Sequence, residues 1–209
     1  MCGGLPHHRP THQEKALPLT TTDTLEQALA DAVAACRWTE AVQLGHQLDT
    51  HTPTPTPPAA LDAALWYATL GIPVFPLRPG TKIPYPGSHG CKDATTNPTQ
   101  IRAWWASAPT ANVAIATGHT VDVIDLDGPT GVKSWLADLW DDMPPICGRA
   151  RTRRPGGWHL YIHTTGMGNR AAMFPGIDYR GQGGYVVAPP STVDSATYRW
   201  TEPLAVGTW

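Results

Sequence analysis

A run of alternating threonine and proline at residues 50–58 constrains the fold of this chain more than any other feature. Proline lacks a backbone N–H and fixes its own backbone angle, so such a run cannot join a helix or the interior of a sheet. We expect an extended, polyproline-type linker that spans roughly 3 Å per residue. The main domain boundary is therefore predicted here, with most of the 209 residues on its C-terminal side.

Before the linker, the sequence predicts a polar arm followed by a short helical segment. Residues 1–20 are polar and interrupted by proline, which indicates a disordered arm. Its histidines could alternatively bind a metal adventitiously, namely His7, His8 and His12. Asp23 and Glu26 have the spacing of a capping box, and an apolar stripe follows them. Residues 21–49 are therefore expected to form two short helices that dock on the main domain or bind a partner.

Beyond the linker, residues 59–209 alternate between helical patterns and short β-prone runs. Apolar stripes predict helices at residues 59–70, 98–105 and 131–141. β-Prone runs predict strands at residues 72–77, 113–116, 121–126, 158–163, 185–188 and 197–200. The run at 72–77 contains two prolines, so we expect it at a sheet edge. This part of the chain is predicted to be one loop-rich domain with both helices and strands.

Charge and cysteine content limit the classes of protein that fit. The net charge of −2 provides no general positive field, so any nucleic-acid site must be a local patch. The four cysteines are scattered and contain no C-x-x-C pair, so free thiols and no structural zinc are expected. The sequence contains neither a signal-peptide core nor an apolar run of about 18 residues that could span a bilayer. We therefore expect a cytoplasmic protein.

Two aspartates, Asp125 and Asp127, stand at the end of the predicted strand 121–126. Alternate residues of a strand share a face, so both side chains should point the same way, with their Cα atoms about 6.6 Å apart. Two like charges this close repel each other, and a shared divalent cation removes the repulsion. Alternatively, Asp127 only forms a turn with Gly128 and Pro129, and Asp125 is a solvated residue of an edge strand.

The predicted strand 158–163 follows a glycine pair, Gly156 and Gly157, that would let the backbone approach a ligand closely. Its apolar residues should be buried, and its other face, with His159, Tyr161 and His163, should line a cleft or meet solvent. His159 is a candidate for hydrogen bonding to a triphosphate. A basic run before it could hold phosphates or a template strand, and consists of Arg149, Arg151, Arg153 and Arg154. The alternative is a surface histidine beside solvated charges.

A third acid, Asp178, precedes Arg180 by two residues, which puts both on one face of a short strand. A glycine-rich turn and the apolar run 185–188 follow. Asp178 could complete a metal site with the first two acids, and Arg180 could neutralise phosphate charge. The alternative is an ordinary surface ion pair, which contributes little to stability.

Taken together, these segments resemble the bifunctional DNA primase/polymerase (prim-pol) domain of the archaeo-eukaryotic primase superfamily. The likeness covers roughly residues 60–200 and includes further short motifs in the expected order, at residues 71–77, 80–84, 89–96, 101–105, 112–118, 184–191 and 198–200. It implies an α+β fold in which an RRM-like catalytic antiparallel sheet packs with an α/β module, here preceded by the small helical N-terminal segment. Arg153, Arg154 and Pro155 depart from the family pattern, which has Thr-Pro-Ser or similar before the glycine pair. A serine contact to the nucleotide is therefore expected to be missing, as is the zinc-bearing insertion of some relatives.

The resemblance implies that the acid pair of the family corresponds to Asp125 and Asp127, its phosphate-contacting histidine to His159, and its third acid to Asp178. The roles of the other residues are hypotheses drawn from their residue types. Two Mg²⁺ or Mn²⁺ ions would be held by Asp125, Asp127 and Asp178 for nucleotidyl transfer. The triphosphate would be bound by His159, Arg180, Lys82 and Gly157, while the arginine run guides the template.

The expected partners are a single-stranded DNA template or primer-template and dNTPs and/or NTPs. We expect no membrane association. A separate helicase or replication protein is expected as well, because no helicase follows Trp209. Two other classes stay open at this point. One is a catalytically weak nucleic-acid-binding module for replication initiation, and the other is a metal-dependent phosphodiesterase.

Overall fold

The chain divides into two compact units, residues 1–52 and 53–209. The computed structural model describes residues 60–138 and 144–206, together with residues 25, 27–29, 31, 32, 40, 43, 44 and 47. The described residues of the first unit are helical. The predicted arm, the predicted linker and the rest of the N-terminal helical segment lie outside the described residues and stay predictions.

A six-stranded antiparallel sheet forms one half of the second unit, with the strand order β11-β4-β5-β3-β7-β6. Its strands are β3 (Val121–Leu126), β4 (Ile146–Arg151), β5 (Trp158–His163), β6 (Arg170–Phe174), β7 (Ile177–Arg180) and β11 (Arg199–Glu202). Strand β3 is hydrogen-bonded to β5 on one side and to β7 on the other. Helix α5 (Gly128–Asp138) packs against β3 and β7.

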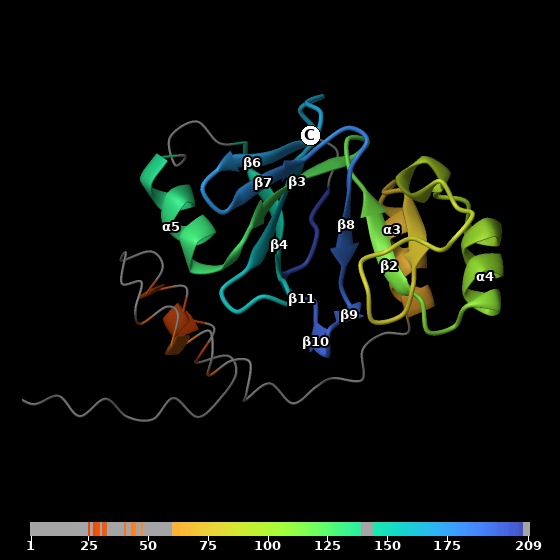
Figure 1. Cartoon of the computed structure of the whole chain (residues 1–209), viewed down its shortest axis with the longest axis horizontal. Helices are drawn as coiled ribbons and strands as arrows, with labels where there is room; N and C mark the ends of the chain where they lie inside the picture. Colours follow the sequence, from red (N-terminus) through yellow and green to blue (C-terminus); the bar gives the residue numbers. More distant parts are fainter. Residues whose placement is uncertain are drawn as a thin grey trace, which may run out of the picture. The chain divides into compact units, whose positions relative to one another are not determined.

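A three-stranded antiparallel sheet, in the order β1-β2-β8, forms the other half. Its strands are β1 (Val74–Leu77), β2 (Asn112–Ala116) and β8 (Tyr185–Ala188). Helix α3 (Ala60–Thr69) packs against β1 and β2, and helix α4 (Pro98–Ser107) packs against α3 and β1. The short helix η1 (Gly90–Asp93) contacts β1 and β2. The strands β9 (Thr192–Val193) and β10 (Ala196–Thr197) form a separate two-stranded sheet, which Figure 1 shows after the end of β8.

Local sequence explains where α4 begins and where α3 ends. The side chain of Asn97 accepts hydrogen bonds from the backbone N–H groups of Thr99 and Gln100, and Pro98 occupies the first turn, so α4 begins there. Gly71 follows α3 with φ of +72°, a backbone conformation that glycine adopts without steric cost.

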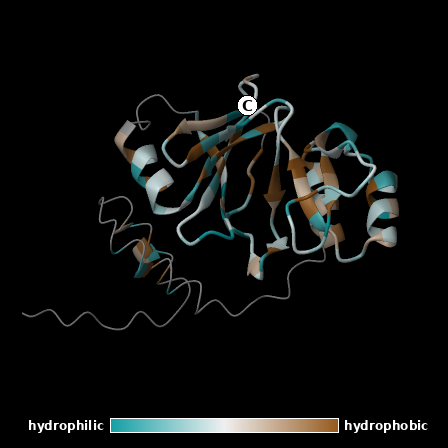
Figure 2. Ribbon diagram, viewed as in Figure 1, coloured by the Kyte–Doolittle hydropathy of each residue, from teal (hydrophilic) through white to brown (hydrophobic). Residues whose placement is uncertain are grey.

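The two faces of the six-stranded sheet are covered by different hydrophobic cores. Val123 and Tyr161 share a core with α3, α4 and the three-stranded sheet. The opposite face, which includes Ile124 and Leu160, shares a second core with Trp135 of α5. Figure 2 shows strands β2 and β8 in hydrophobic colours, in agreement with the burial of every residue of β2. The first core therefore joins the two sheets into one unit.

Most of the elements predicted for the second unit are confirmed. The strands expected at 121–126, 158–163 and 185–188 coincide with β3, β5 and β8. Strand β1 is an edge strand, as its prolines indicated. Helix α5 begins at Gly128, three residues before the predicted start, and residues 139–143 lie outside the described part. None of the helices among the described residues has the length and apolar character needed to cross a bilayer, and the cytoplasmic location stays a prediction.

Three features of the sheets differ from the sequence prediction. No strand was predicted at β4, which the sequence analysis treated only as a basic run, but its arginines alternate with small buried residues that pack into the sheet. Strand β6 carries no apolar alternation and contains Ala172 at φ of +47°, so no periodic pattern marks it. The run 197–200 is divided at Tyr198 between β10 and β11, which belong to different sheets. The second unit is thus a mixed α+β structure with antiparallel sheets.

Gly176, which precedes β7, should tolerate alanine poorly. Its φ is +72°, and an added Cβ would lie 2.6 Å from the backbone nitrogen of Gly131. We expect Gly176→Ala to lower the free energy of unfolding by at least about 3 kcal/mol, from backbone strain and overpacking together. Gly183→Ala is the matched control, since its φ is +79° but an added Cβ would meet no atom within 4 Å. Urea unfolding of the full chain measures both, and equal losses would show that the close approach to α5 is unimportant.

Candidate active site

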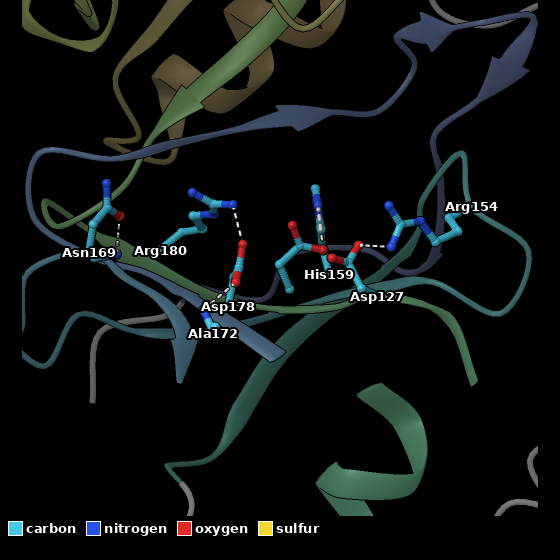
Figure 3. A network of polar contacts seen from close by, with 9 residues as sticks. Asp127, Arg154, His159, Asn169, Ala172, Asp178 and Arg180 are labelled. Atoms are coloured by element: carbon cyan, nitrogen blue, oxygen red, sulfur yellow. Dashed lines mark hydrogen bonds and ion pairs between the residues drawn. The ribbon is translucent and has the colours of Figure 1, made fainter. Parts of the chain in front are cut away.

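The register of β3 brings two of the predicted acids and the predicted histidine side by side. Asp125 is the direct partner of His159 on β5 and of Asp178 on β7. Directly opposed residues on neighbouring strands point to the same face, with Cβ atoms about 5 Å apart. The three side chains therefore form a row across the middle of the sheet, part of which is visible in Figure 3.

The third acid, Asp127, lies just beyond the end of β3. Its backbone N–H donates to the carbonyl of Gly176 at 2.8 Å, which keeps the chain alongside the start of β7. Its carboxylate is 3.0 Å from a guanidinium nitrogen of Arg154. Figure 3 shows Asp127 beside His159, with Arg154 at the outer end.

Asp178 is held by two donors at the other end of the row. One carboxylate oxygen accepts the backbone N–H of Ala172 at 2.7 Å, and the other is 2.5 Å from Arg180. The acid cluster, defined as Asp125, Asp127 and Asp178, therefore has an arginine at each end.

The donor chemistry of the acid cluster suits hard divalent cations, because Mg²⁺ and Mn²⁺ prefer carboxylate oxygens. Among the described residues, however, no three side chains of Asp, Glu, His or Cys are gathered closely enough to hold a metal ion. Two of the acids turn toward arginines instead. In this arrangement, ion pairs with Arg154 and Arg180 offset part of the mutual repulsion of the carboxylates.

His159, the histidine of this row, is buried, with only 3 % of its side chain exposed. Its Nε2 lies 3.5 Å from a carboxylate oxygen of Asp125. The rings of Tyr161 and Tyr198 flank the imidazole, with centroids 6.2 and 5.6 Å away. Within the described part of the chain, Nδ1 has no hydrogen-bond partner. The ring orientation is thus set by aromatic packing on two sides and a carboxylate on the third.

Burial is the main cause that lowers the pKa of His159. The negative charge of Asp125 acts in the opposite direction, while the positive charges of Lys82 and Arg180 add to the lowering. The imidazole is therefore neutral at pH 7 and presents one N–H donor and one acceptor nitrogen.

Lys82 is an exposed residue between β1 and η1 whose charge interacts with the acid cluster. Desolvation lowers its pKa, Asp125 and Asp127 raise it, and Arg153 and Arg154 lower it further. The charge of the lysine ammonium group therefore interacts with the charges of the acids and of the two arginines. Its contact with a triphosphate stays a prediction.

The arginine run does not form one surface. Arg149 and Arg151 pair across the strands with Leu160 and Trp158, so they lie on the face opposite the acid cluster. Arg149 forms an ion pair with Glu202, and the guanidinium carbon of Arg151 lies 4.8 Å from the centre of the Trp158 ring. The structure therefore does not bring these two arginines to the candidate site.

The other two arginines of the run follow β4 and lie near the acids. Arg154 contacts Asp127, and Arg153 is 2.8 Å from Asp194 in the turn between β9 and β10. Gly157 closes the same loop, because its N–H donates to the carbonyl of Arg154 at 2.8 Å. A Cβ on Gly157 would lie 2.3 Å from the hydroxyl of Thr152, so this turn itself requires glycine there.

The prediction that the polar face of β5 lines a cleft or meets solvent is wrong for its middle residue. Tyr161 is fully buried in the core that joins the two sheets, and only His163 at the strand end is half-buried. The face is covered because the three-stranded sheet and α3 pack against it. Sequence alternation distinguishes the two faces of a strand but does not reveal what packs on each.

Two site neighbours were not identified as functional residues from the sequence. Tyr198 packs against His159, and burial raises its pKa to about 12, so the phenol stays protonated. Tyr185 donates its hydroxyl to the backbone carbonyl of Lys82 at 3.0 Å. Both tyrosines belong to motifs that carried the resemblance, which was the one available signal.

The tryptophans of α4 and α5 contribute mainly to the cores. Trp105 is buried and donates its indole N–H to the carbonyl of Ala111, while Trp104 is partly buried. Trp135 is buried against the apolar face of the sheet, and Trp140 lies outside the described residues.

Comparison with known proteins identified one matching family. The family model described as "Bifunctional DNA primase/polymerase, N-terminal" matches residues 64–207, which is most of the chain. The match includes every residue of the acid cluster, His159 and both flanking arginines. Among curated proteins, no match was found.

Divalent metal should stabilise the fold through the acid cluster. With Mn²⁺ or Mg²⁺ at ten times its dissociation constant, we expect the melting temperature to rise by about 3–6 °C. Asp125→Asn should abolish most of this rise, because it removes the central carboxylate. Asp62→Asn is the control, since Asp62 is exposed on α3, away from the cluster. A rise that persists in Asp125→Asn would place the metal elsewhere.

Proposed function

The chain belongs to the bifunctional DNA primase/polymerase family, and on this premise we propose that it catalyses metal-dependent, template-directed nucleotidyl transfer. The reaction would synthesise or extend primers during DNA replication. The observation that carries the proposal is the register that sets Asp125 between His159 and Asp178, with arginines at both ends of the acids. We also propose that the six-stranded sheet is the RRM-like catalytic sheet of the family.

Proteins of this family typically depend on divalent metal, and the acid cluster offers suitable donors. Asp125, Asp127 and Asp178 would hold two Mg²⁺ or Mn²⁺ ions. When bound, such ions lower the pKa of a primer 3′-hydroxyl and stabilise the charge of departing pyrophosphate. The proposal needs Asp127 and Asp178 to exchange their arginine partners for metal.

That exchange would make the arginines available to the substrate. Once Asp178 no longer neutralises it, Arg180 can donate two parallel hydrogen bonds to phosphate oxygens. His159, neutral at pH 7, can donate one hydrogen bond to the same triphosphate without adding charge. Lys82 can add a mobile positive charge from the side of the three-stranded sheet. The cations paired with acids in the free protein would then be the ones that bind phosphate during catalysis.

Of the basic run, Arg153 and Arg154 are the residues that we propose to guide the template. Both lie in the loop that follows β4, close to Asp127. Arg149 and Arg151 are not included, because they lie on the opposite face of the sheet.

A labelled primer-template assay with dNTPs and Mn²⁺ tests the proposed reaction. The wild-type chain should extend the primer, and Asp125→Ala combined with Asp127→Ala should slow extension at least about a hundredfold, because the charge-stabilising site is lost. The control combines Asp62→Ala with Glu202→Ala, which removes two exposed acids elsewhere.

The same gel separates the proposal from its two rivals. Unchanged extension by the Asp125 and Asp127 double variant would contradict the assignment of the site. A strand that becomes shorter would indicate a phosphodiesterase. Binding without any incorporation by wild type would indicate a nucleic-acid-binding replication module.

Two similarly exposed arginines allow a matched test of template binding. The side chain of Arg153 is 36 % exposed and that of Arg149 is 38 %, and each forms one ion pair with an acid. Arg153→Gln should weaken primer-template binding and reduce the slope of log K against log salt by about one unit, the value for one phosphate contact. Arg149→Gln should leave both quantities unchanged. Fluorescence anisotropy over a salt series measures them, and equal effects of the two variants would rule out a template path limited to the Arg153 side.

A further inference from the structure

The segment between β1 and η1 forms a compact turn that presents Lys82. The N–H of Arg78 donates to the carbonyl of Ile83 at 2.9 Å, and the N–H of Thr81 donates to the carbonyl of Arg78 at 3.1 Å. Leu77 and Pro84 pair as a β-bridge at the base. The backbone of this Lys82 turn, defined as residues 78–83, is thus closed on itself.

Two side chains from other elements anchor the Lys82 turn at consecutive carbonyls. The hydroxyl of Tyr185 donates to the carbonyl of Lys82 at 3.0 Å. The amide of Asn112 donates to the carbonyl of Thr81, also at 3.0 Å. Asn112 is buried and exchanges two further hydrogen bonds with the backbone of Thr192, so its orientation is determined. Of the two anchors, Asn112 fixes the turn to β2 and Tyr185 fixes it to β8.

A chain of contacts connects the Lys82 turn with the acid cluster. The N–H of Asp194 donates to the carbonyl of Gly80 at 3.3 Å, and the carboxylate of Asp194 pairs with Arg153. The next residue, Arg154, contacts Asp127. The turn is therefore tied to the loop beside the acids as well as to the three-stranded sheet.

Tyr185 also stands at the connection between the two sheets. It follows Arg180 after the glycine-rich residues 181–184, and this segment is held by the hydroxyl of Thr117, which donates to the carbonyl of Gly181 at 2.7 Å. The ring of Tyr185 packs edge-on against Phe75, with centroids 5.2 Å apart. The ring of Tyr185 is therefore fixed by packing, and its hydroxyl makes one hydrogen bond that connects β8 with the Lys82 turn.

We propose that Tyr185 is a positioning residue that holds the Lys82 turn beside the acid cluster, so that the Lys82 ammonium meets the triphosphate of the incoming nucleotide. This rests on the proposed function. Lysine has a long, flexible side chain, and its affinity for phosphate falls if the backbone that carries it must also be ordered on binding. Loss of the Tyr185 hydroxyl would release one anchor of that backbone while leaving the ring and its packing in place.

Nucleotide affinity in a four-variant cycle tests the proposal. The variants are wild type, Tyr185→Phe, Lys82→Ala and the double variant, titrated with a fluorescent dATP analogue and Mn²⁺. Tyr185→Phe should weaken binding about 3–10-fold, the effect of one net hydrogen bond. In the Lys82→Ala background, the same change should have no further effect, because the positioned group is gone. Tyr85→Phe is the control. This tyrosine is partly buried and lies close to the turn, but its hydroxyl makes none of the described hydrogen bonds that hold the Lys82 turn.

The outcomes separate a positioning role from a merely structural one. An equal loss of affinity in both backgrounds, or no loss in either, would overturn the proposal. The melting temperature of Tyr185→Phe should stay within about 2 °C of wild type, since the hydroxyl bond is exposed to water. Because the readout is binding, a chain that binds dATP as expected but extends no primer would contradict the proposed function and still support this role for Tyr185.

Discussion

The candidate site depends on the antiparallel register of β3 with its two neighbours. This register makes Asp125 the direct partner of both His159 and Asp178, although these residues are far apart in the sequence. A slip by one residue would turn Asp125 toward the core under α5 and would turn Ile124 toward the site. Burial of Ile124 and its neighbours against α5 selects this register. The same register aligns Asp125 with His159 and Asp178 on the opposite face of the sheet.

Charge balance is the second constraint on the site. Neighbouring carboxylates repel each other, and in the free protein Arg154 and Arg180 each neutralise one of them. In the proposed function, the same arrangement keeps the cations that would bind phosphate close to the carboxylates that would hold metal. Under this proposal, metal and nucleotide would bind as the acids and arginines exchange partners within a fixed backbone, by side-chain rotation and without movement of strands.

The three-stranded sheet supports the site although it carries no residue of the acid cluster. Its core encloses Tyr161, and Tyr185 and Asn112 on β8 and β2 hold the turn that carries Lys82. The glycine-rich residues 181–184 connect Arg180 on one sheet directly to Tyr185 on the other. The residues of the proposed site therefore come from both halves of the unit, which the shared hydrophobic core joins.

Local sequence by itself determined the strands β3, β5 and β8 and the residue types of the acid cluster. It also determined that Asp125 and His159 lie on the polar face of their strands. Side-chain alternation and β-propensity act over only a few residues, so a local pattern is enough for these features. The tertiary structure alone decided which strands are neighbours, and hence that Asp178 adjoins Asp125. It also decided that the arginine run is divided between two faces, that Tyr161 is buried, and that the hydroxyl of Tyr185 donates to the carbonyl of Lys82. These features depend on the pairing of distant strands and on what packs against each face, which no local pattern encodes.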